Sequence, residues 1–457
     1  MKEINKLKDK KVLVVGMGKS GIAAVQALIK LEAKVYVQDS KAAEDIDSQL
    51  IAFLKGKIEK MYFAEVPSPE ETFDIIVLSP GVSPETDFVE QAKKKGAEII
   101  GELEIAYRVG HGNYVAITGT NGKTTTTTLV GEIFQKSGRK TYVVGNIGVA
   151  VISKAISAEP DSWLITETSS FQLETIKEFK PKISAILNIT PDHMDRHHTM
   201  RNYGDAKARV FENQDENDFF VVNYDDKALF EYAKDCKAKV IPFSRKEELP
   251  LGAFVEGENI VVRNQSGETV VICDKSRLQI PGAHNLENAL AAVAITYFAG
   301  IDPEVIADTL VKFLGVEHRM EFCGEIDGIR FINDSKGTNP DASIKALEAI
   351  NGNIVLIAGG YDKNSTYEKF IEAFNGKVKT LVLLGKTAPK IKETAEKMGF
   401  TSIIMAKDME ECVREAFKAS ASGDTVLLSP ACASWDMYSC FEQRGEHFKN
   451  CVERLGE

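Results

Sequence analysis

The stretch Ile117-Thr118-Gly119-Thr120-Asn121-Gly122-Lys123-Thr124-Thr125 follows a β-type run at 114–116 and precedes a helical pattern. Its two glycines allow the backbone to bend so that several N–H groups converge on one anion, and the start of the helix adds its positive end. Lys123 is placed to reach the outer phosphates of a nucleotide, and the Thr124 hydroxyl is placed to bind Mg²⁺. The stretch therefore predicts a phosphate-binding loop, a shortened variant of G-x-x-x-x-G-K-[ST] because Ile117 stands at the first glycine position.

The predicted helix after this loop begins with the β-branched run Thr124 to Thr128, which is a poor helix start on propensity alone. Binding of the threonine hydroxyls to phosphate or metal would stabilise that turn. The alternative interpretation is an ordinary glycine-containing turn in an α/β unit.

The composition is that of an ordinary globular protein, with 457 residues, 44% of them hydrophobic and 27% charged, and this length predicts about three domains. The formal net charge of -11 argues against a general nucleic-acid or membrane surface, so we expect neither as a partner. The seven cysteines have no C-x-x-C spacing, and we expect reduced thiols in a cytoplasmic protein. No apolar run approaches the length of a transmembrane helix.

A G-x-G-x-x-G turn at 16–21 joins an apolar strand at 11–15 to a helix at 22–31, and the strand at 35–38 ends at Asp39. This pattern is typical of dinucleotide-binding folds, in which an acid near that spacing binds a ribose. A nicotinamide-dependent oxidoreductase is therefore one hypothesis, although the same turn can hold any diphosphate, including that of a UDP-sugar. The next predicted strand, 74–78, runs into Ser79-Pro80-Gly81-Val82, at the strand end where α/β sheets bind ligands.

The stretch 108–113 is interpreted as a linker, and beyond it strands at 141–144, 162–165, 183–187 and 219–222 alternate with helices. This alternation predicts a mostly parallel sheet covered by helices on both faces. Polar residues follow the strand ends, among them Glu167 and His193, and all such ends share the edge where the phosphate loop lies. We expect both residues to converge on a metal, although each taken alone would be a solvated carboxylate or a loop histidine.

A weaker β-rich stretch at 239–278 predicts hairpins, with the runs 259–262 and 268–272 flanking a turn near Ser266-Gly267. A second boundary falls at 313–317. Beyond it the alternation returns with strands at 354–357, 380–384 and 425–428, and polar stretches lie at 331–339 and 429–436.

The sequence resembles the Mur ligases, the ATP-dependent amino-acid-adding enzymes of peptidoglycan synthesis. The resemblance rests on the stretches 119–125, 145–148, 167–173, 188–196, 282–288, 318–319, 333–339 and 429–445. The G-x-G-x-x-G turn, the run Ser429 to Asp436 and Phe441-Glu442-Gln443-Arg444-Gly445 are similar to the members that add D-glutamate. Trp435 stands at a position where we expect side-chain size to vary among them.

The resemblance implies an α/β fold of three domains in series. Residues 1–109 would be a Rossmann-like domain that binds the UDP substrate. Residues 110–316 would be a P-loop ATPase-like domain with a mostly parallel sheet, which binds ATP, and 317–457 a Rossmann-like domain that binds the amino acid. Because the implied ATP residues are divided between the last two domains, we expect the last domain to close onto the phosphate loop.

The resemblance implies that the carboxylate of UDP-N-acetylmuramoyl-L-alanine takes the γ-phosphoryl group of ATP, and that the amine of D-glutamate attacks the resulting acyl phosphate. Two anions must meet in the first step, and metal ions, Lys123 and the helix end make that approach tolerable. The resemblance further implies that ATP and two Mg²⁺ ions are the cofactors. It also implies a cytoplasmic location, a role in cell shape and division, and a monomeric state.

The resemblance also implies roles for individual residues. The catalytic residues would be Lys123, His193, Lys207 and Lys336. Thr124 and Glu167 would hold the first Mg²⁺ and His193 the second. Lys207 would be carbamylated, since a carbamate supplies the oxygens that Mg²⁺ prefers.

The residues that would hold ATP are Gly119, Thr120, Asn121, Gly122, Lys123, Thr124, Thr125, Asn288, Arg319 and Asp334. Those that would contact the uridine diphosphate are Gly18, Ser20, Asp39, Ser79 and Gly81, and those for the muramoyl peptide are Asn146, Thr168 and Ser169. The D-glutamate pocket would consist of Thr338, Lys363, Ser434 and Phe441.

Three alternatives remain open from the sequence. One is another Mur-type ligase that adds a different amino acid, and one is the nicotinamide-dependent oxidoreductase. The third is a regulatory nucleotide switch, and the missing Asn-Lys-x-Asp motif counts against its GTP-binding form.

Overall fold

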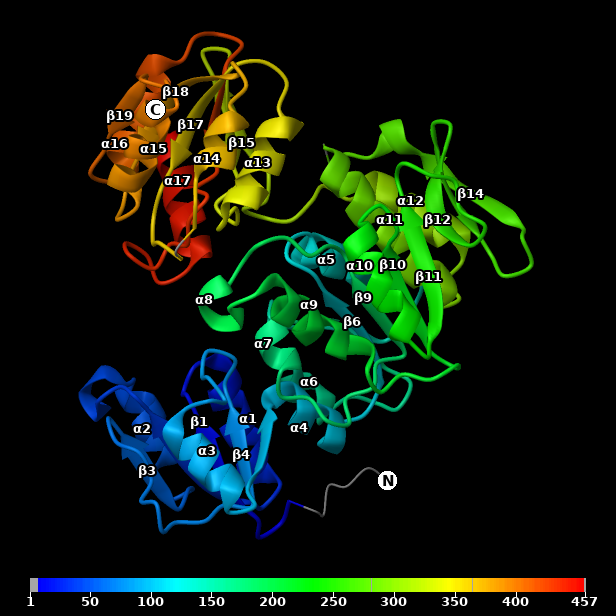
Figure 1. The fold of residues 1–457 in the computed structure, drawn as a ribbon, viewed down its shortest axis with the longest axis vertical. Coiled ribbons are helices and arrows are strands. Elements are labelled where there is room, and N and C mark those ends of the chain that lie inside the picture. The colour runs from blue at the N-terminus through cyan, green and yellow to red at the C-terminus, as the bar shows by residue number, and fades with distance from the viewer. Residues whose placement is uncertain (1–6, 281, 364, 456–457) are drawn as a thin grey trace.

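The computed structural model describes residues 7–280, 282–363 and 365–455, which form three α/β units in series, each around its own sheet (Figure 1). The predicted fold class is confirmed. The predicted boundaries at 109/110 and 316/317 stay predictions.

The first unit is a parallel sheet in the order β3-β2-β1-β4-β5. Its strands are β1 (Lys11–Val15), β2 (Lys34–Asp39), β3 (Lys60–Phe63), β4 (Ile75–Leu78) and β5 (Glu98–Gly101), and its helices are α1 (Lys19–Lys30), α2 (Ser48–Leu54), α3 (Asp87–Lys94) and α4 (Glu102–Val109). The order reverses between β1 and β4, so the loops after these two strands flank the crevice where such sheets bind ligands.

The central unit is a nine-stranded sheet in the order β14-β13-β12-β11-β10-β9-β6-β8-β7. Its strands are β6 (Asn113–Thr118), β7 (Thr141–Gly145), β8 (Trp163–Glu167), β9 (Ile183–Ile186), β10 (Phe219–Asn223), β11 (Lys239–Ser244), β12 (Gly252–Glu256), β13 (Asn259–Arg263) and β14 (Thr269–Asp274). Its helices are α5 (Lys123–Lys136), α6 (Val151–Ala155), α7 (Ser170–Leu173), α8 (Met194–His197), α9 (Met200–Ala208), α10 (Lys227–Phe230), α11 (Ala283–Phe298) and α12 (Pro303–Lys312).

One predicted hairpin of the central unit is confirmed, because β13 and β14 pair antiparallel around the turn at 264–268. The hairpin interpretation of the preceding stretch is wrong for β11, which pairs in parallel with both β10 and β12. An alternating apolar pattern specifies a half-buried strand but not the direction of its neighbour, and α10 supplies the crossover that a parallel pair requires.

The last unit is a six-stranded sheet in the order β15-β16-β20-β17-β18-β19, parallel except for the edge strand β15. Its strands are β15 (Glu321–Ile326), β16 (Ile329–Asn333), β17 (Ile354–Ala358), β18 (Val378–Leu383), β19 (Ile403–Met405) and β20 (Thr425–Leu428). Its helices are α13 (Pro340–Ala349), α14 (Glu368–Glu372), α15 (Ala388–Lys397), α16 (Met409–Ala419) and α17 (Phe441–Leu455).

The segment predicted as a linker, 108–113, is not a loose connection. Arg108 and Val109 end α4, Asn113 begins β6, and Gly110 between them is buried. A Cβ at Gly110 would lie 2.5 Å from Cβ of Ala155, so the glycine permits α4 to approach α6 closely. From sequence alone, a glycine required for close packing cannot be distinguished from a glycine in a flexible linker.

The hydrophobic cores show how the three units are joined. One continuous buried cluster runs from the first unit through Ile105 and Val109 of α4 into the central unit, whereas the clusters of the last unit are separate. The last unit is connected through the segment 313–317 and through polar contacts. None of the helices in the described ranges is long and apolar enough to span a bilayer.

Candidate active site

The predicted phosphate-binding loop joins β6 to α5, and a glycine at its end has a left-handed backbone. Gly122 has a φ of 83°, and a Cβ there would lie 2.2 Å from Oδ1 of Asn288. Asn188 braces the loop, since its Oδ1 accepts from the Asn121 N–H at 2.9 Å and its Nδ2 donates to the Asn121 carbonyl at 3.0 Å. The loop therefore has a cradle shape that a side chain at position 122 would disturb.

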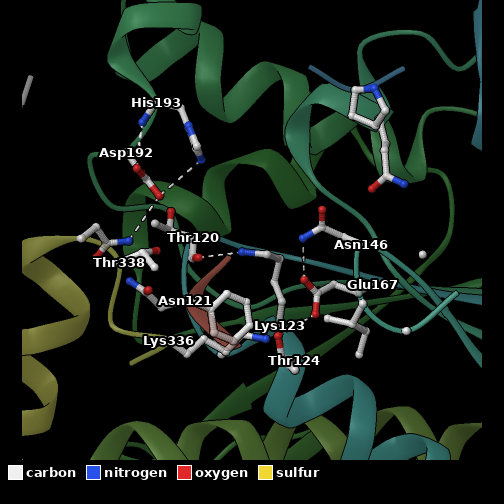
Figure 2. Close-up of a pocket in the computed structure, with 18 of the residues that line it drawn as sticks. Thr120, Asn121, Lys123, Thr124, Asn146, Glu167, Asp192, His193, Lys336 and Thr338 are labelled. Atoms are coloured by element: carbon white, nitrogen blue, oxygen red, sulfur yellow. Dashed lines mark hydrogen bonds and ion pairs between the residues drawn. The ribbon is translucent and has the colours of Figure 1, made fainter. Parts of the chain in front are cut away.

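A carboxylate lies against the first turn of α5 (Figure 2). Thr124 Oγ1 donates to Oε2 of Glu167 at 2.8 Å, and Asn146 Nδ2 donates to its Oε1 at 2.8 Å. Glu167 ends β8 and Asn146 follows β7, so two neighbouring parallel strands bring them to the edge where the loop lies. Glu167 is only 2% exposed. A buried carboxylate beside a hydroxyl offers the hard oxygen donors that Mg²⁺ prefers, so these residues fit that ion.

The loop after β9 carries Asp192 and His193 to the same cavity (Figure 2). Burial lowers the pKa of His193 to about 4, against the opposing charge of Asp192. The imidazole is therefore neutral at pH 7 and keeps a lone pair for a metal or a proton. Burial raises the pKa of Asp192, but the charges of Lys363, His193 and Lys123 outweigh it and the net shift is downward.

Two lysines, one half-buried and one fully buried, donate to carbonyls of the phosphate loop. Lys123 Nζ lies 2.9 Å from the Gly119 carbonyl and 2.7 Å from that of Thr120, and Lys207 Nζ lies 2.9 Å from the same Gly119 oxygen. Burial lowers the pKa of both amino groups, and the charge of Lys123 lowers that of Lys207 further. Lys207 is 1% exposed and its Nζ lies 4.5 Å from the centre of the Tyr203 ring. The loop thus holds both lysines beside the cradle.

The last unit brings its own polar side chains to this cavity. Lys336 Nζ lies 4.9 Å from the centre of the Phe441 ring, and burial lowers its pKa to about 8. Both oxygens of Asp192 have partners in the last unit. Lys363 Nζ pairs with Asp192 Oδ1 at 3.6 Å, and Asn339 Nδ2 donates to Asp192 Oδ2 at 3.2 Å. The cavity has a volume of about 430 Å³ and residues of all three units line it.

Comparison with known proteins identifies the family. The Mur ligase middle domain matches residues 117–296, the Mur ligase glutamate ligase domain matches 318–432, and the Mur ligase MurD-like N-terminal domain matches 10–101. The chain belongs to the Mur ligase family. Among similar proteins is UDP-N-acetylmuramoylalanine--D-glutamate ligase of Thermoanaerobacter sp. (strain X514), 52% identical over 98% of this chain and 99% of its own. The protein of the same name from Clostridioides difficile (strain 630) is 48% identical with the same coverage.

Solved structures of Mur ligases share the fold of this Mur ligase at low sequence identity. UDP-N-acetylmuramate-alanine ligase MurC from Thermotoga maritima aligns with a TM-score of 0.59 and 19% identity, covering 98% of this chain and 99% of that one. MurF ligase from Thermotoga maritima, in complex with ADP, aligns with a TM-score of 0.60 and 15% identity, covering 100% and 98%. Mur ligases use ATP and Mg²⁺ on small-molecule substrates. The oxidoreductase and switch hypotheses are therefore abandoned.

Most of the residues predicted to hold ATP in this Mur ligase meet in a narrow cleft between the central and last units. Those lining it are Asn121, Gly122, Thr125, Asn288, Arg319 and Asp334. Asp334 is fully buried, accepts from Ser429 Oγ at 2.8 Å and pairs with Arg319 at 3.3 Å. Burial raises its pKa, against the effect of Arg319. The cleft has a volume of about 20 Å³, room for about one water molecule, so an adenine ring would fit there only if the cleft widened.

The residues predicted to contact the uridine diphosphate line one cavity of about 900 Å³ at the switch point of the first sheet. They are Gly18, Ser20, Asp39, Ser79 and Gly81. Asp39 Oδ2 accepts from the Met17 N–H at 2.7 Å, and Ser79 Oγ donates to the Gly16 carbonyl at 2.7 Å, so the two loops are braced. Ser20 also lines the central cavity, and the two cavities meet there.

The other predicted substrate residues divide into two groups. Those that line the central cavity are Asn146, Thr338, Lys363 and Phe441. Thr168 is fully buried and donates to the Ile117 carbonyl at 3.2 Å, and Ser169 caps α7 in a reciprocal pair with Gln172. The Ser434 hydroxyl is buried and has no hydrogen-bond partner in the described part of the chain. The structure therefore shows local structural contacts for Thr168 and Ser169 and an unpartnered donor at Ser434.

Sequence reasoning missed several residues that shape this site, among them Asn188, Asp192, Asn339 and Asp341. Asn188 and Asp192 fall within a stretch that the family resemblance had singled out, yet only their polar type in a loop hinted at them. Asp192 and its partner Asn339 are 147 positions apart. A single sequence carries no signal for such a contact between two units.

Proposed function

We propose that this Mur ligase joins D-glutamate to the carboxylate of UDP-N-acetylmuramoyl-L-alanine, in peptidoglycan precursor synthesis, while ATP is cleaved to ADP and phosphate. The observation that carries the proposal is the single cavity in which Lys123 of the phosphate loop, Ser20 of the first unit and Lys363 of the last unit meet. A ligase must bring an acceptor, a phosphoryl donor and an amine together in one space. Residues of all three units line this cavity, so each unit can contribute to binding one of them. Relatives about 50% identical are named UDP-N-acetylmuramoylalanine--D-glutamate ligase, which supports the choice of substrates.

In the first proposed step an oxygen of the acceptor carboxylate attacks the γ-phosphorus and ADP leaves. Lys123 and the N-terminus of α5 would bind the negative charge of the phosphates, because the first N–H groups of a helix have no partner within the helix. Thr124 and Glu167 would hold one Mg²⁺ and His193 would help to hold a second. Bound Mg²⁺ supplies charge neutralisation for the meeting of two anions. Lys336 would bind the phosphoryl group during transfer. The Phe441 ring, whose centre lies 4.9 Å from Nζ, would hold the amino group in position.

In the second proposed step the amine nitrogen of D-glutamate attacks the acyl carbon, phosphate leaves and the nitrogen loses a proton. Lys363, Thr338 and the unpartnered Ser434 hydroxyl would bind the carboxylates of the amino acid. The departing phosphate can accept the proton, because the lone pair of His193 is assigned to the second Mg²⁺. Uridine diphosphate would occupy the cavity of the first unit, between the turn at 16–21 and the loop at 79–82.

We also propose that Lys207 is carbamylated in the active enzyme. The amino group is buried, and its only hydrogen bond in the described residues is to the Gly119 carbonyl. Burial lowers its pKa, which favours the uncharged amine that adds CO₂. The carbamate would supply oxygens for Mg²⁺. After equilibration with ¹³CO₂, the ¹³C spectrum should show one carbamate signal that a Lys207→Met variant lacks. Equal spectra would contradict the modification.

We propose a monomer that acts in the cytoplasm, where ATP is available. Light scattering on the eluting protein should give the mass of one chain, and the mass of two chains would contradict this.

Phosphate release tests the proposed reaction directly. With ATP, Mg²⁺ and UDP-N-acetylmuramoyl-L-alanine, we expect release with D-glutamate and none with L-glutamate, L-alanine or L-lysine offered in turn. Release with another amino acid instead would identify a Mur-type ligase of different specificity. A folded protein that binds ATP but is silent with all four would overturn the proposed acceptor.

A further inference from the structure

Asp341, the second residue of α13, reaches with its carboxylate across the interface between the last and central units. Its Oδ2 accepts hydrogen bonds from Nδ2 of Asn121 at 2.5 Å and from Oγ1 of Thr190 at 3.0 Å. Lys345, one helical turn along α13, holds the same oxygen at 3.1 Å from its own unit. One carboxylate oxygen of the last unit therefore contacts two donors of the central unit.

The two donors lie on different loops of the site. Asn121 belongs to the phosphate loop, and Thr190 lies in the loop that leads to His193. These loops are also joined to each other, because the Thr120 hydroxyl accepts from the Thr190 N–H and donates to its carbonyl, each at 3.0 Å. Asp341 thus fixes the last unit to a pair of loops that are already bonded to each other.

Asp341 lines neither the central cavity nor the nucleotide cleft. It lies next to the cleft, however, because Asn121 lines one side of the cleft and Ala342, Lys345 and Ala346 of α13 line the other. The bond from Asn121 to Asp341 therefore spans the two walls that must separate before a nucleotide can enter. The volume of about 20 Å³ between those walls shows that this bond accompanies a closed cleft.

Among the described residues, few other polar contacts cross this interface. The hydrophobic clusters of the last unit are separate from those of the central unit. A second polar contact lies deeper, where Asp192 meets Asn339 and Lys363, and these three residues line the catalytic cavity, where substrates would compete for them. The carboxylate of Asp341 is thus a closing contact that lies outside both the catalytic cavity and the cleft.

We propose that Asp341 is a latch, a positioning residue that holds the last unit against the phosphate loop and the His193 loop and that releases to admit the nucleotide. Its bonds open when the cleft widens and form again around bound ATP. The effect on turnover rests on the proposed function, whereas the effects on shape and on nucleotide entry do not.

The test compares Asp341→Ala with Glu348→Ala, which removes an exposed carboxylate from the same helix. Without ligands, small-angle scattering should give a larger radius of gyration for Asp341→Ala than for the parent and the control. In stopped-flow measurements, a fluorescent ATP analogue should bind Asp341→Ala about tenfold faster than it binds the parent. This is the factor expected when the closed state loses one charge-assisted hydrogen bond. Ligase turnover should fall by a similar factor, because closure around ATP is weakened.

Thr190→Val removes one of the two latch donors with little change in shape, and it serves as a second variant if Asp341→Ala does not fold. It should accelerate nucleotide binding less than Asp341→Ala does, and the double variant should resemble Asp341→Ala alone, because both changes remove the same contact. Scattering and binding rates equal to those of the parent in both variants would overturn the latch. If the parent binds the nucleotide but forms no product with D-glutamate, the proposed reaction fails while the shape and binding comparison still decides on the latch.

Discussion

At the scale of single residues, the absence of a side chain at Gly122 shapes the nucleotide site. Its φ of 83° is costly for any other residue, and a Cβ would lie 2.2 Å from Oδ1 of Asn288. We expect Gly122→Ala to weaken ATP binding at least about tenfold, because the loop or Asn288 must shift away from the cradle. Titration calorimetry with ATP and Mg²⁺ measures this.

Gly138 provides the matched control, since its φ is 82° but a Cβ there would meet nothing within 4 Å. Left-handed strain should cost both alanine variants about 1–2 kcal/mol of unfolding free energy, and Gly122→Ala should lose more because of its contact with Asn288. Only Gly122→Ala should lose affinity. Equal ATP affinities for the two variants would contradict the cradle.

The sequence allowed the phosphate loop and its contact with Glu167 to be predicted, because polar ends of neighbouring parallel strands must share an edge. The roles assigned to these residues stay predictions. The bond from Asp341 to Asn121 could not be predicted, since it joins residues 220 positions apart whose proximity depends on how two units pack. Nor does the sequence show that Thr168 turns its hydroxyl to a backbone carbonyl rather than to a substrate.

At the scale of elements, α4 fastens the first unit to the central one. Glu104 of α4 is fully buried and accepts from the backbone N–H groups of Lys177, Glu178 and Phe179 at 2.9, 2.9 and 3.0 Å, and from Arg108 Nε at 2.7 Å. Glu104→Gln should lower the unfolding free energy by about 3 kcal/mol, because the charge that these donors face is lost. Urea unfolding measures the change.

Glu178→Gln is the control for Glu104→Gln. Glu178 pairs with the same Arg108 at 3.5 Å, but its side chain is 63% exposed. Exposed pairs contribute little, so we expect a change of at most about 1 kcal/mol. Similar losses for the two variants would show that α4 is not fastened through its buried carboxylate.

Glu102, at the start of α4, should make the unfolding free energy depend on pH. Burial raises its pKa to about 7, although the Ile152 N–H donates to its Oε1 at 2.6 Å. The folded protein therefore binds a proton more tightly than the unfolded chain, so this contribution is full at low pH and is lost as pH rises toward 7 and above. Between pH 5 and 8 the unfolding free energy of the parent should fall by about 3 kcal/mol more than that of Glu102→Gln. Parallel pH profiles of urea unfolding would contradict this assignment.

Elements were predictable where their apolar runs are buried on both faces, as in β6, β8 and β17. The edge strand β3 was missed because only Tyr62 among its residues is fully buried. The hairpin of β15 and β16 was missed as well, because β15 has no fully buried residue and its alternation is weak. Burial against a partner, rather than propensity, decides such strands.

At the scale of the whole molecule, the continuous core through α4 makes the first two units one body, and the last unit is attached through 313–317 and polar contacts. We expect the last unit to move relative to that body during turnover. Scattering profiles with and without ATP, Mg²⁺ and the UDP substrate should differ. Identical profiles would contradict this movement.

The central claim is that the shared cavity activates the acceptor carboxylate by phosphorylation before D-glutamate attacks. The most direct measurement uses UDP-N-acetylmuramoyl-L-alanine labelled with ¹⁸O in its carboxylate, together with ATP, Mg²⁺ and D-glutamate. We predict that each amide formed places one ¹⁸O atom in inorganic phosphate, as mass spectrometry detects, and leaves the other in the amide carbonyl. Amide formation with unlabelled phosphate, or with the label in AMP, would contradict the account.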